Sequence, residues 1–192
     1  MIPVFVAAVF AVSMTPQQRL VEGKADSPVR VLIFEDLQCS DCAVFRVMLD
    51  EKLLPKYGAK VAFEHRDFPL AKHAWARPAA IAARYLQTVD LAKAVKFRQL
   101  AMKSQAEIKP ENFNSFLAIF CEANGIDRDK ALAALQDPKL EALVQKDFED
   151  GVARGIAHTP TALVNGVPFI ETFTVEEISK GIDAALKENG IQ

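Results

Sequence analysis

The chain has 192 residues, of which 51% are hydrophobic and 25% charged, and its formal net charge at pH 7 is -2. That length and hydrophobic content suffice for one globular domain with a sizeable core and room for a subdomain. Acidic and basic residues are interspersed, so the sequence shows neither the basic footprint of a nucleic-acid-binding protein nor a polybasic patch for anionic lipid. We therefore expect no nucleic acid partner and no polybasic membrane-binding patch.

Residues 1–13 form an apolar opening segment. Ile2 to Val12 is almost wholly hydrophobic but too short to span a bilayer, and Ala11-Val12-Ser13 offers the small residues that a signal peptidase requires. This pattern predicts a signal peptide and an exported protein, periplasmic or otherwise extracytoplasmic. Because no Lys or Arg precedes the apolar run, a truncated signal or a segment packed on the domain is the alternative.

Strand and helix signals then alternate. A buried strand is expected from Val29 to Glu35, and a helix from Cys42 to Leu54 that Pro55 and Gly58 end. Residues 60–66 predict a second strand, parallel to the first. The expected helix is buried on a broad side, which carries Val44, Phe45, Val47, Met48, Leu49 and Leu53.

No strand signal appears from Ala71 to about Arg154. Helical periodicity instead runs through five segments punctuated by Pro110, Gly125 and Pro138. These segments are 75–87, 91–103, 111–123, 128–135 and 138–154. We expect an inserted helical domain over 71–154, between the two parts of an α/β domain at 25–70 and 155–190.

Strand signals return near the C-terminus. Residues 161–164 and 167–170 flank Asn165-Gly166, a strong signal for a hairpin with a type I′ turn. An amphipathic helix is expected from Val175 to Lys187.

Two cysteines lie where the first strand meets the first helix, in Cys39-Ser40-Asp41-Cys42. A cysteine at a helix N-terminus meets unpaired backbone N–H groups and the positive end of the helix dipole, and both favour a thiolate. We therefore predict that Cys39 is a redox nucleophile. Cys42 lies nearly one turn further on, close enough to form a disulfide and more shielded from solvent, so it is the expected resolving thiol.

Other uses of a cysteine pair fit less well. A structural zinc site needs about four ligands, and the chain has only Cys121 and three scattered histidines to add, so no metal is expected. A purely structural disulfide across one turn would close too short a loop to stabilise the fold much. Cys121 itself lies in an apolar helix, where a free cysteine usually behaves as a small buried hydrophobe.

Three segments together resemble the DsbA-like thiol-disulfide oxidoreductases of the thioredoxin superfamily. They are Phe34-Glu35-Asp36-Leu37-Gln38-Cys39-Ser40-Asp41-Cys42, then Arg66-Asp67-Phe68-Pro69-Leu70 with His73 and the alanine-rich helix around 79–83, and finally Gly155-Ile156-Ala157-His158-Thr159-Pro160-Thr161 followed by Asn165-Gly166. The likeness covers about residues 29–186. It implies an α/β protein with a thioredoxin fold and an inserted all-helical domain, an enzyme of disulfide exchange, and no cofactor.

The resemblance also implies that Pro160 is cis and faces the pair formed by Cys39 and Cys42. X-Pro bonds are those in which the cis form is cheap, about 0.5 to 1 kcal/mol above trans. Such a kink would expose the backbone of Thr159, where an extended substrate could pair beside Cys39. Thr159 and Pro160 are therefore the expected substrate-binding residues, and an ordinary loop proline before a strand is the alternative.

Ser40, Asp41 and His158 are the residues expected to tune the pKa of Cys39. The strongly oxidising members of the family usually hold a histidine where this chain has Asp41, and a carboxylate there opposes the thiolate by roughly 1 kcal/mol. The pair should then be less oxidising than a strong oxidase. His158 would offset this effect if its ring approached Cys39, and an exposed loop histidine is the alternative.

A second departure from the family lies at Ile33. The family and its relatives commonly place a buried acidic residue six positions before the first cysteine, where it assists proton transfer, and Ile33 cannot do so. Glu35 and Asp36 are nearby, but the resemblance gives them no role. His65, at the end of a strand, and His73, near the start of a helix, are expected to be structural.

The sequence therefore predicts a thiol-disulfide oxidoreductase that acts through a mixed disulfide at Cys39. Its partners would be protein substrates with thiols or disulfides and a redox partner protein. The competing class is a binding module, either one that binds metal through Cys39, Cys42 and His158 or a redox-inert peptide-binding domain. The residues leave the direction of exchange open among oxidation, reduction and isomerisation.

Overall fold

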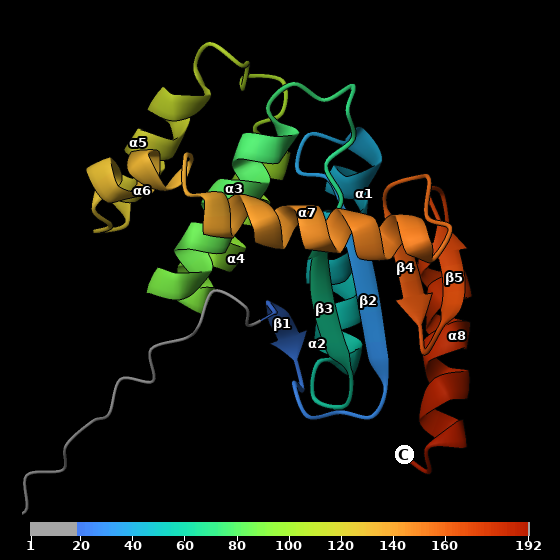
Figure 1. Ribbon diagram of the computed structural model, residues 1–192. Coiled ribbons are helices and arrows are strands. Elements are labelled where there is room, and N and C mark those ends of the chain that lie inside the picture. Colours follow the sequence, from blue (N-terminus) through green and yellow to red (C-terminus); the bar gives the residue numbers. More distant parts are fainter. Residues whose placement is uncertain (1–18, 192) are drawn as a thin grey trace, which may run out of the picture.

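The structure, a computed structural model, describes residues 19–191. A five-stranded mixed sheet lies at their centre (Figure 1). Its strand order is β1-β3-β2-β4-β5, with β2 and β3 parallel and the other pairs antiparallel. The strands are β1 Val21–Gly23, β2 Arg30–Glu35, β3 Ala62–Asp67, β4 Thr161–Val164 and β5 Val167–Ile170. The expected signal peptide at 1–13 lies outside the described residues.

Helices cover both faces of this sheet. In Figure 1, α7 crosses in front of β2 and β3, while α1 and α2 lie behind them. The helices are α1 Ser40–Met48, the π-helical turn η1 Leu49–Leu53, α2 Leu54–Tyr57, α3 Ala76–Val89, α4 Leu91–Lys103, α5 Phe113–Ala123, α6 Arg128–Ala134, α7 Pro138–Ala153 and α8 Val175–Glu188. None of the helices within residues 19–191 has the length and apolarity needed to cross a membrane.

The central strand β2 is buried on both faces, which explains its hydrophobic run. Ile33 points to the face where Phe45 of α1 and Ile182 of α8 pack, and the next residue, Phe34, points to the opposite face beside Phe68. β2 pairs with β3 from end to end, and Glu35 lies opposite Asp67. The carboxyl ends of the two parallel strands therefore meet at one edge, and Cys39 follows that edge.

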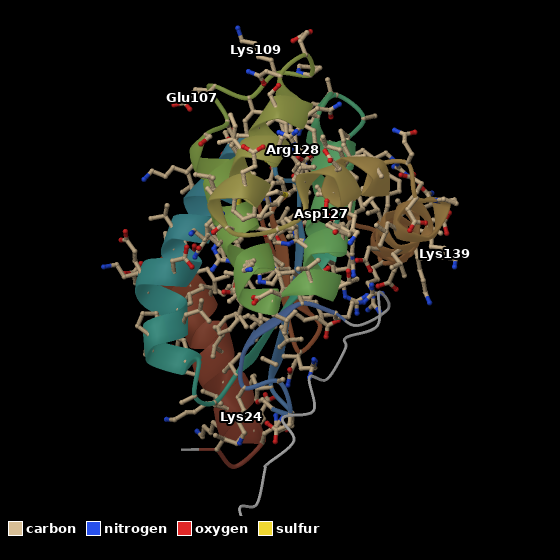
Figure 2. The ribbon with its side chains drawn as sticks, turned by 90° about the vertical axis from the view of Figure 1, so that its left-hand side faces the viewer. Lys24, Glu107, Lys109, Asp127, Arg128 and Lys139 are labelled. Atoms are coloured by element: carbon tan, nitrogen blue, oxygen red, sulfur yellow. The ribbon has the colours of Figure 1, made fainter. Side chains whose placement is uncertain are left out.

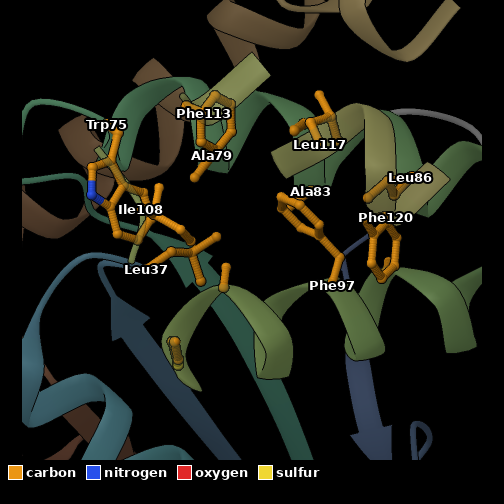
Figure 3. Packing of buried hydrophobic residues seen from close by; sticks show 14 of the residues in the cluster. Leu37, Trp75, Ala79, Ala83, Leu86, Phe97, Ile108, Phe113, Leu117 and Phe120 are labelled. Carbon is orange, nitrogen blue, oxygen red and sulfur yellow. The ribbon is translucent and has the colours of Figure 1, made fainter. Parts of the chain in front are cut away.

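The segment between β3 and β4 is helical from α3 to α7, as the sequence predicts. Figure 3 shows its core, where the ring of Trp75 stacks on Phe113 and the ring of Phe97 meets Phe120 edge-on. The same cluster contains Cys121, which is fully buried, and extends to Leu37, Cys39 and Cys42. The helical insertion and the sheet domain thus share one contact zone next to the cysteine pair.

On the outer side of this insertion, charges of both signs lie close together. Figure 2 shows Glu107 near Lys109 and Asp127 beside Arg128 on that face. The Arg128 guanidinium pairs with Glu122 at 2.5 Å. The mixed charge expected from the sequence is therefore seen on this face.

The helix after the cysteine pair differs from its prediction. It does not stop at Pro55, because η1 leads directly into α2 and Pro55 lies in the first turn of α2, where a missing N–H is tolerated. Helical structure ends at Gly58. Val44 and Val47 are 66% and 54% exposed, so the prediction that they are buried is wrong.

The buried side of this helix follows a narrower stripe than its apolar residues suggest. Phe45, Leu49 and Leu53 recur every four residues and are at most 3% exposed, because only this stripe faces the sheet.

Two further local features complete the sheet. β1, only three residues long, pairs antiparallel with β3 and is too short for its sequence to show a strand pattern. The hairpin between β4 and β5 is as predicted. Asn165 and Gly166 both have positive φ angles, 44° and 93°, as a type I′ turn requires.

Candidate active site

The loop between β2 and α1 fixes the position of Cys39. The Asp36 carboxylate accepts hydrogen bonds from the backbone N–H of Gln38 at 2.7 Å and of Leu70 at 2.8 Å. His73 Nδ1 lies 2.8 Å from the same carboxylate, so His73 helps to hold Asp36 in place. Asp36 thereby ties the Cys39 loop to the segment after β3.

Cys39 is the N-cap residue of α1 and is a free thiol, as is Cys42. A hydrogen bond from the Cys42 thiol is the largest influence on Cys39 and, against the opposing effect of burial, lowers the pKa of Cys39 to about 5. The backbone N–H groups of Cys42 and Asp41 lower this pKa further. The N-terminal turn of α1 therefore stabilises a thiolate at Cys39.

Cys42 has the opposite shift. It is 0% exposed against 7% for Cys39, and burial raises the pKa of Cys42 well above its usual value. The neighbouring Cys39 and the charge of Glu35 raise it further, although the backbone N–H of Asp36, 3.4 Å from the Cys42 sulfur, opposes them. At neutral pH this arrangement provides a reactive thiolate beside a protonated thiol.

The Thr159–Pro160 peptide bond is cis and its loop faces Cys39. The Cys39 sulfur lies 3.3 Å from the carbonyl oxygen of Thr159, to which Cys39 donates when it is protonated. Thr159 is only 2% exposed, so the cis bond does not open its backbone to solvent as expected. The role of Thr159 and Pro160 in substrate binding stays a prediction. Its carbonyl is directed at Cys39, and the solvent-exposed residues of this loop are Ala157 and His158.

The residues expected to tune Cys39 lie in three different places. Ser40 and Asp41 are exposed in the first turn of α1, and Asp41 acts on the Cys39 pKa chiefly through its backbone N–H, so repulsion by its carboxylate stays a prediction. The His158 ring is directed at Glu171, with Nδ1 2.9 Å from the carboxylate, and its side chain is 59% exposed. The exposed-loop alternative for His158 is therefore the one that the geometry favours.

A buried carboxylate and imidazole lie behind Cys42, and the sequence reasoning missed them. His65 Nδ1 is 2.8 Å from Glu35 and Nε2 is 2.9 Å from Glu22, inside the sheet domain. Burial by itself would lower the pKa of His65, but the charges of Glu35 and Glu22 outweigh it and hold this pKa above its usual value. His65 thus lies between two carboxylates within β3 and links β1, β2 and β3 through its side chain.

The strand pattern contains a signal that could have revealed Glu35. Residues two apart on a strand share a face, so Glu35 lies on the face of Ile33, the position where the family commonly has its acidic residue. The Glu35 carboxylate is near enough to Cys42 to raise its pKa. A buried acid is therefore present behind the pair, but two residues further along the chain.

The Glu35 carboxylate also takes part in ion pairs that join the helical insertion to the sheet. Arg98 of α4 donates to Glu35 at 2.9 Å and to Asp67 at 2.6 Å. Arg84 of α3 donates to Asp67 at 2.5 Å and also pairs with Asp147 of α7. These side chains are nearly fully buried, so the chain of ion pairs is shielded from solvent and locks the two parts together.

Two neighbouring pockets open beside Cys39. One, of about 360 Å³, is lined by Cys39 and the 157–159 loop, and the other, of about 230 Å³, lies between α1 and the segment after β5. Asp41 and Glu171 line both pockets. The lining of the second pocket is otherwise mainly apolar and consists of Val44, Phe45, Met48, Thr172, Phe173 and Thr174. Within residues 19–191, no group of three or more His, Cys, Asp or Glu side chains is arranged to hold a metal ion.

The fold and the cysteine pair together define a thioredoxin-fold protein with a dithiol at the start of its first helix. A family model described as Thioredoxin matches residues 15–184, and the chain belongs to this family.

Solved structures confirm the expected arrangement of a thioredoxin fold with a helical insertion. BdbD from Bacillus subtilis, in its oxidised form, is similar with a TM-score of 0.79 and 23% identity over 88% of this chain and 93% of that chain. The α-DsbA1 protein of Wolbachia pipientis gives 0.77 and 17%, over 88% and 92%. MdbA, a thiol-disulfide oxidoreductase from Corynebacterium diphtheriae, gives 0.72 and 16%, over 90% and 91%.

Curated relatives are longer than this chain. A protein of Salinispora arenicola named Na(+)/H(+) antiporter NhaA 1 is 24% identical over 175 residues, which are 91% of this chain. The chain spans 26% of the length of that relative.

Proposed function

We propose that the protein is a thiol-disulfide oxidoreductase that exchanges disulfides with cysteines of other proteins through a mixed disulfide at Cys39. The observation that carries this proposal is the opposite pKa shift of the two thiols, with Cys39 lowered to about 5 and Cys42 raised. The thiolate is the nucleophilic form of cysteine, so at neutral pH Cys39 is ready to attack while Cys42 keeps its proton.

The exchange proceeds in two steps. The Cys39 thiolate attacks one sulfur of a substrate disulfide, a bond forms between Cys39 and that sulfur, and the other substrate sulfur leaves as a thiolate. Cys42 then loses its proton and attacks Cys39, which releases the first substrate sulfur and leaves a disulfide between Cys39 and Cys42. The substrate gains two electrons and the protein loses them, and the reverse sequence oxidises a substrate dithiol.

The coupling between the two thiols supports this order of events. The neighbouring Cys39 raises the pKa of Cys42 by hydrogen bonding and by charge. Formation of the mixed disulfide removes the charge on Cys39, so the pKa of Cys42 falls at the stage when Cys42 has to become a nucleophile. Cys42 therefore stays protonated until the mixed disulfide has formed, and its thiolate becomes accessible only then.

We also propose that the pair is less oxidising than the strong oxidases of the family. A stabilised Cys39 thiolate makes the disulfide more oxidising, and the α1 N-terminus acts in that direction. Asp41 acts in the other direction, because a carboxylate repels the thiolate where those oxidases hold an attractive histidine.

We further propose an extracytoplasmic location, which suits this chemistry because disulfides persist outside the cytoplasm. The apolar segment at 1–13 supports that location.

Trapping of mixed disulfides tests the roles of the two cysteines. The Cys42→Ser variant should accumulate mixed disulfides when it is incubated with a mixture of proteins that contain disulfides. Mass spectrometry should locate these adducts at Cys39, and the Cys39→Ser variant should accumulate none. Adducts found mainly on Cys42 in the Cys39→Ser variant would reverse the assignment.

Insulin reduction, measured with and without added zinc or copper, separates the proposal from the two binding-module alternatives. The oxidoreductase should turn over in the absence of metal and lose all activity in Cys39→Ser. Stoichiometric metal capture without turnover would support the metal-binding alternative. If the protein shows neither turnover nor metal binding, the redox-inert peptide-binding domain is the alternative that remains.

A further inference from the structure

Glu171 has a backbone conformation that its residue type disfavours. It directly follows β5 with a φ of 53°, in the left-handed region that favours glycine. Its N–H donates to the carbonyl oxygen of Pro160 at 2.8 Å, so the Cys39-facing loop holds the backbone in this state. A side chain kept at a strained position next to a reactive group is a reason to look for its function.

The Glu171 side chain lies at the border between the two pockets beside Cys39. It lines both of them, and so does Asp41. Lys72 lines only the pocket that holds Cys39, and the residues that line the second pocket include no Lys, Arg or His. His158 contacts the Glu171 carboxylate from the side of the Cys39 pocket. Two carboxylates, Asp41 and Glu171, therefore line the border between the pockets, and the basic side chains Lys72 and His158 line only the Cys39 pocket.

We propose that Asp41 and Glu171 form an acidic selectivity element that favours substrates with Arg or Lys next to the reactive cysteine. The inference rests on the proposed function, because the substrate cysteine has to bind at Cys39. The Cα of a residue adjacent to that cysteine is about 3.8 Å from the cysteine Cα. The pocket that contains Cys39 is also lined by Asp41 and Glu171, so the adjacent side chain is placed beside these carboxylates. The preferred occupant is an extended segment with a cysteine, a basic neighbour and then an apolar residue, which enters the second pocket beside Val44 and Phe173.

The expected preference is modest because both carboxylates are exposed. Exposed ion pairs are weak, so two of them should favour an arginine peptide over a glutamate peptide by about three- to tenfold. The preference should shrink as salt is added, since salt screens charges at the surface.

Short peptides activated at their cysteine test this preference. In the Cys42→Ser protein, the Cys39 thiolate attacks the peptide sulfur of a mixed disulfide with 5-thio-2-nitrobenzoate, the Cys39–peptide disulfide forms, and the coloured thiolate leaves. The peptides are Gly-Cys-X-Leu-Gly and Gly-Leu-X-Cys-Gly with blocked ends, where X is Arg, Gln or Glu. Each rate is divided by the rate of the same peptide with 2-mercaptoethanol, an otherwise uncharged thiol, which removes intrinsic differences in reactivity.

We expect the normalised rates to fall in the order Arg, Gln, Glu in at least one of the two peptide series. Glu171→Gln and Asp41→Asn should each reduce the Arg to Glu ratio, and the double variant should bring it close to one. The matched control is Glu176→Gln, an exposed acid in the first turn of α8 that lines neither pocket, and it should leave the ratio unchanged. Ratios within one variant cancel any change in the overall reactivity of Cys39.

Failure of this inference can be told apart from failure of the proposed function. If Cys39 forms adducts with all peptides and the Arg to Glu ratio is near one, or is unaffected by both Glu171→Gln and Asp41→Asn, the acidic selectivity element is disproved. If Cys39 forms no adduct with any peptide, the oxidoreductase proposal itself fails.

Discussion

Two chemically identical thiols, Cys39 and Cys42, have opposite protonation preferences because their surroundings differ within a single helical turn. Cys39 sits at the N-cap, where backbone N–H groups and the Cys42 thiol can donate to its sulfur. Cys42 is turned into the core, where a charge is costly and where the nearby Glu35 carboxylate is a like charge. The difference in reactivity thus comes from the placement of the side chains and not from their chemistry.

The low pKa of Cys39 predicts a pH profile. Alkylation of Cys39 by iodoacetamide in the Cys42→Ala variant, which has no side-chain donor at position 42, should be slow at acid pH and rise with pH as the thiolate forms. Because the Cys42 thiol is the largest cause of the shift, the midpoint in this variant should lie above the value of about 5 for the native site. The native reduced protein, in which Cys39 is the reactive thiol, should show the lower midpoint. Equal midpoints would contradict the role of the Cys42 hydrogen bond.

The same shift predicts how the stability of the reduced protein depends on pH. A depressed pKa in the folded state means that the unfolded chain binds the Cys39 proton more tightly. The stabilisation from Cys39 is therefore complete above the unfolded thiol pKa of about 9 and is lost as the pH falls toward about 5. Urea unfolding of reduced native protein and of Cys39→Ser across this window should show the difference between them growing with pH.

Asp41 tests the account of redox strength. Asp41→Asn removes a negative charge near Cys39, so the Cys39 pKa should fall and the reduction potential should rise by roughly 20 mV, which corresponds to about 1 kcal/mol for this two-electron couple. Asp41→His should raise it further, because a protonated imidazole attracts the thiolate. Equilibration against a glutathione buffer gives the potentials. A fall in either variant would mean that the Asp41 carboxylate does not oppose the thiolate.

At the scale of elements, α7 approaches the sheet closely because it carries Gly151. A Cβ atom at this position would lie 2.6 Å from the ring of Phe68 and 3.1 Å from that of Phe34. Phe68 cannot move aside easily, since it is 2% exposed and stacks on Phe148. The contact explains how a helix of the insertion packs directly against β2 and β3.

Gly151→Ala should therefore destabilise the protein. In a helix interior this change normally stabilises by up to about 1 kcal/mol, but overpacking a core costs about 1 to 3 kcal/mol, so the steric cost should win. The midpoint of urea unfolding measures the result. Ala153→Gly, near the exposed end of the same helix, separates general helix propensity from the close contact. A stabilised Gly151→Ala variant would show that the Phe68 ring can move away.

At the scale of the whole molecule, buried ion pairs connect the sheet domain to the helical insertion. Glu35 and Asp67 end the two parallel strands, Arg98 bridges them, and Arg84 continues to Asp147. A buried charge is tolerated only when it is paired, so the pairs specify how the insertion docks. Glu35 also raises the pKa of Cys42, so we propose that the docking contacts and the cysteine pair are coupled.

Replacement of Glu35 by Gln tests this coupling with two measurements. Without the Glu35 carboxylate, the buried Arg98 and His65 each lose a negatively charged partner, so the free energy of unfolding should drop by about 3 to 5 kcal/mol. The pKa of Cys42 should fall, because the charge of Glu35 raises it. The exposed Glu188→Gln is the matched control and should change neither quantity. A stable Glu35→Gln protein with an unchanged Cys42 pKa would contradict the proposed coupling.

The sequence by itself determined the features that depend on local interactions. The position of Cys39 at a helix start, the turn at Asn165-Gly166 and the helical stretch from α3 to α7 follow from the spacing and conformational preferences of neighbouring residues. Such preferences act over a few residues, and they are readable without knowing what packs against them. The cysteine pair was therefore found from local patterns as a candidate site, whereas the loop that faces it was expected only from the family resemblance.

The tertiary structure alone decided which polar groups meet. Glu35 and His65 come from two different strands and Arg98 from a helix. The role of a charged residue on a buried strand can be predicted only when its partner is known. The same holds for Thr159, whose carbonyl turns to Cys39, and for Glu171, which the chain brings to the pocket border from beyond β5. Contacts between residues distant in sequence depend on how whole elements pack, and no local pattern encodes that.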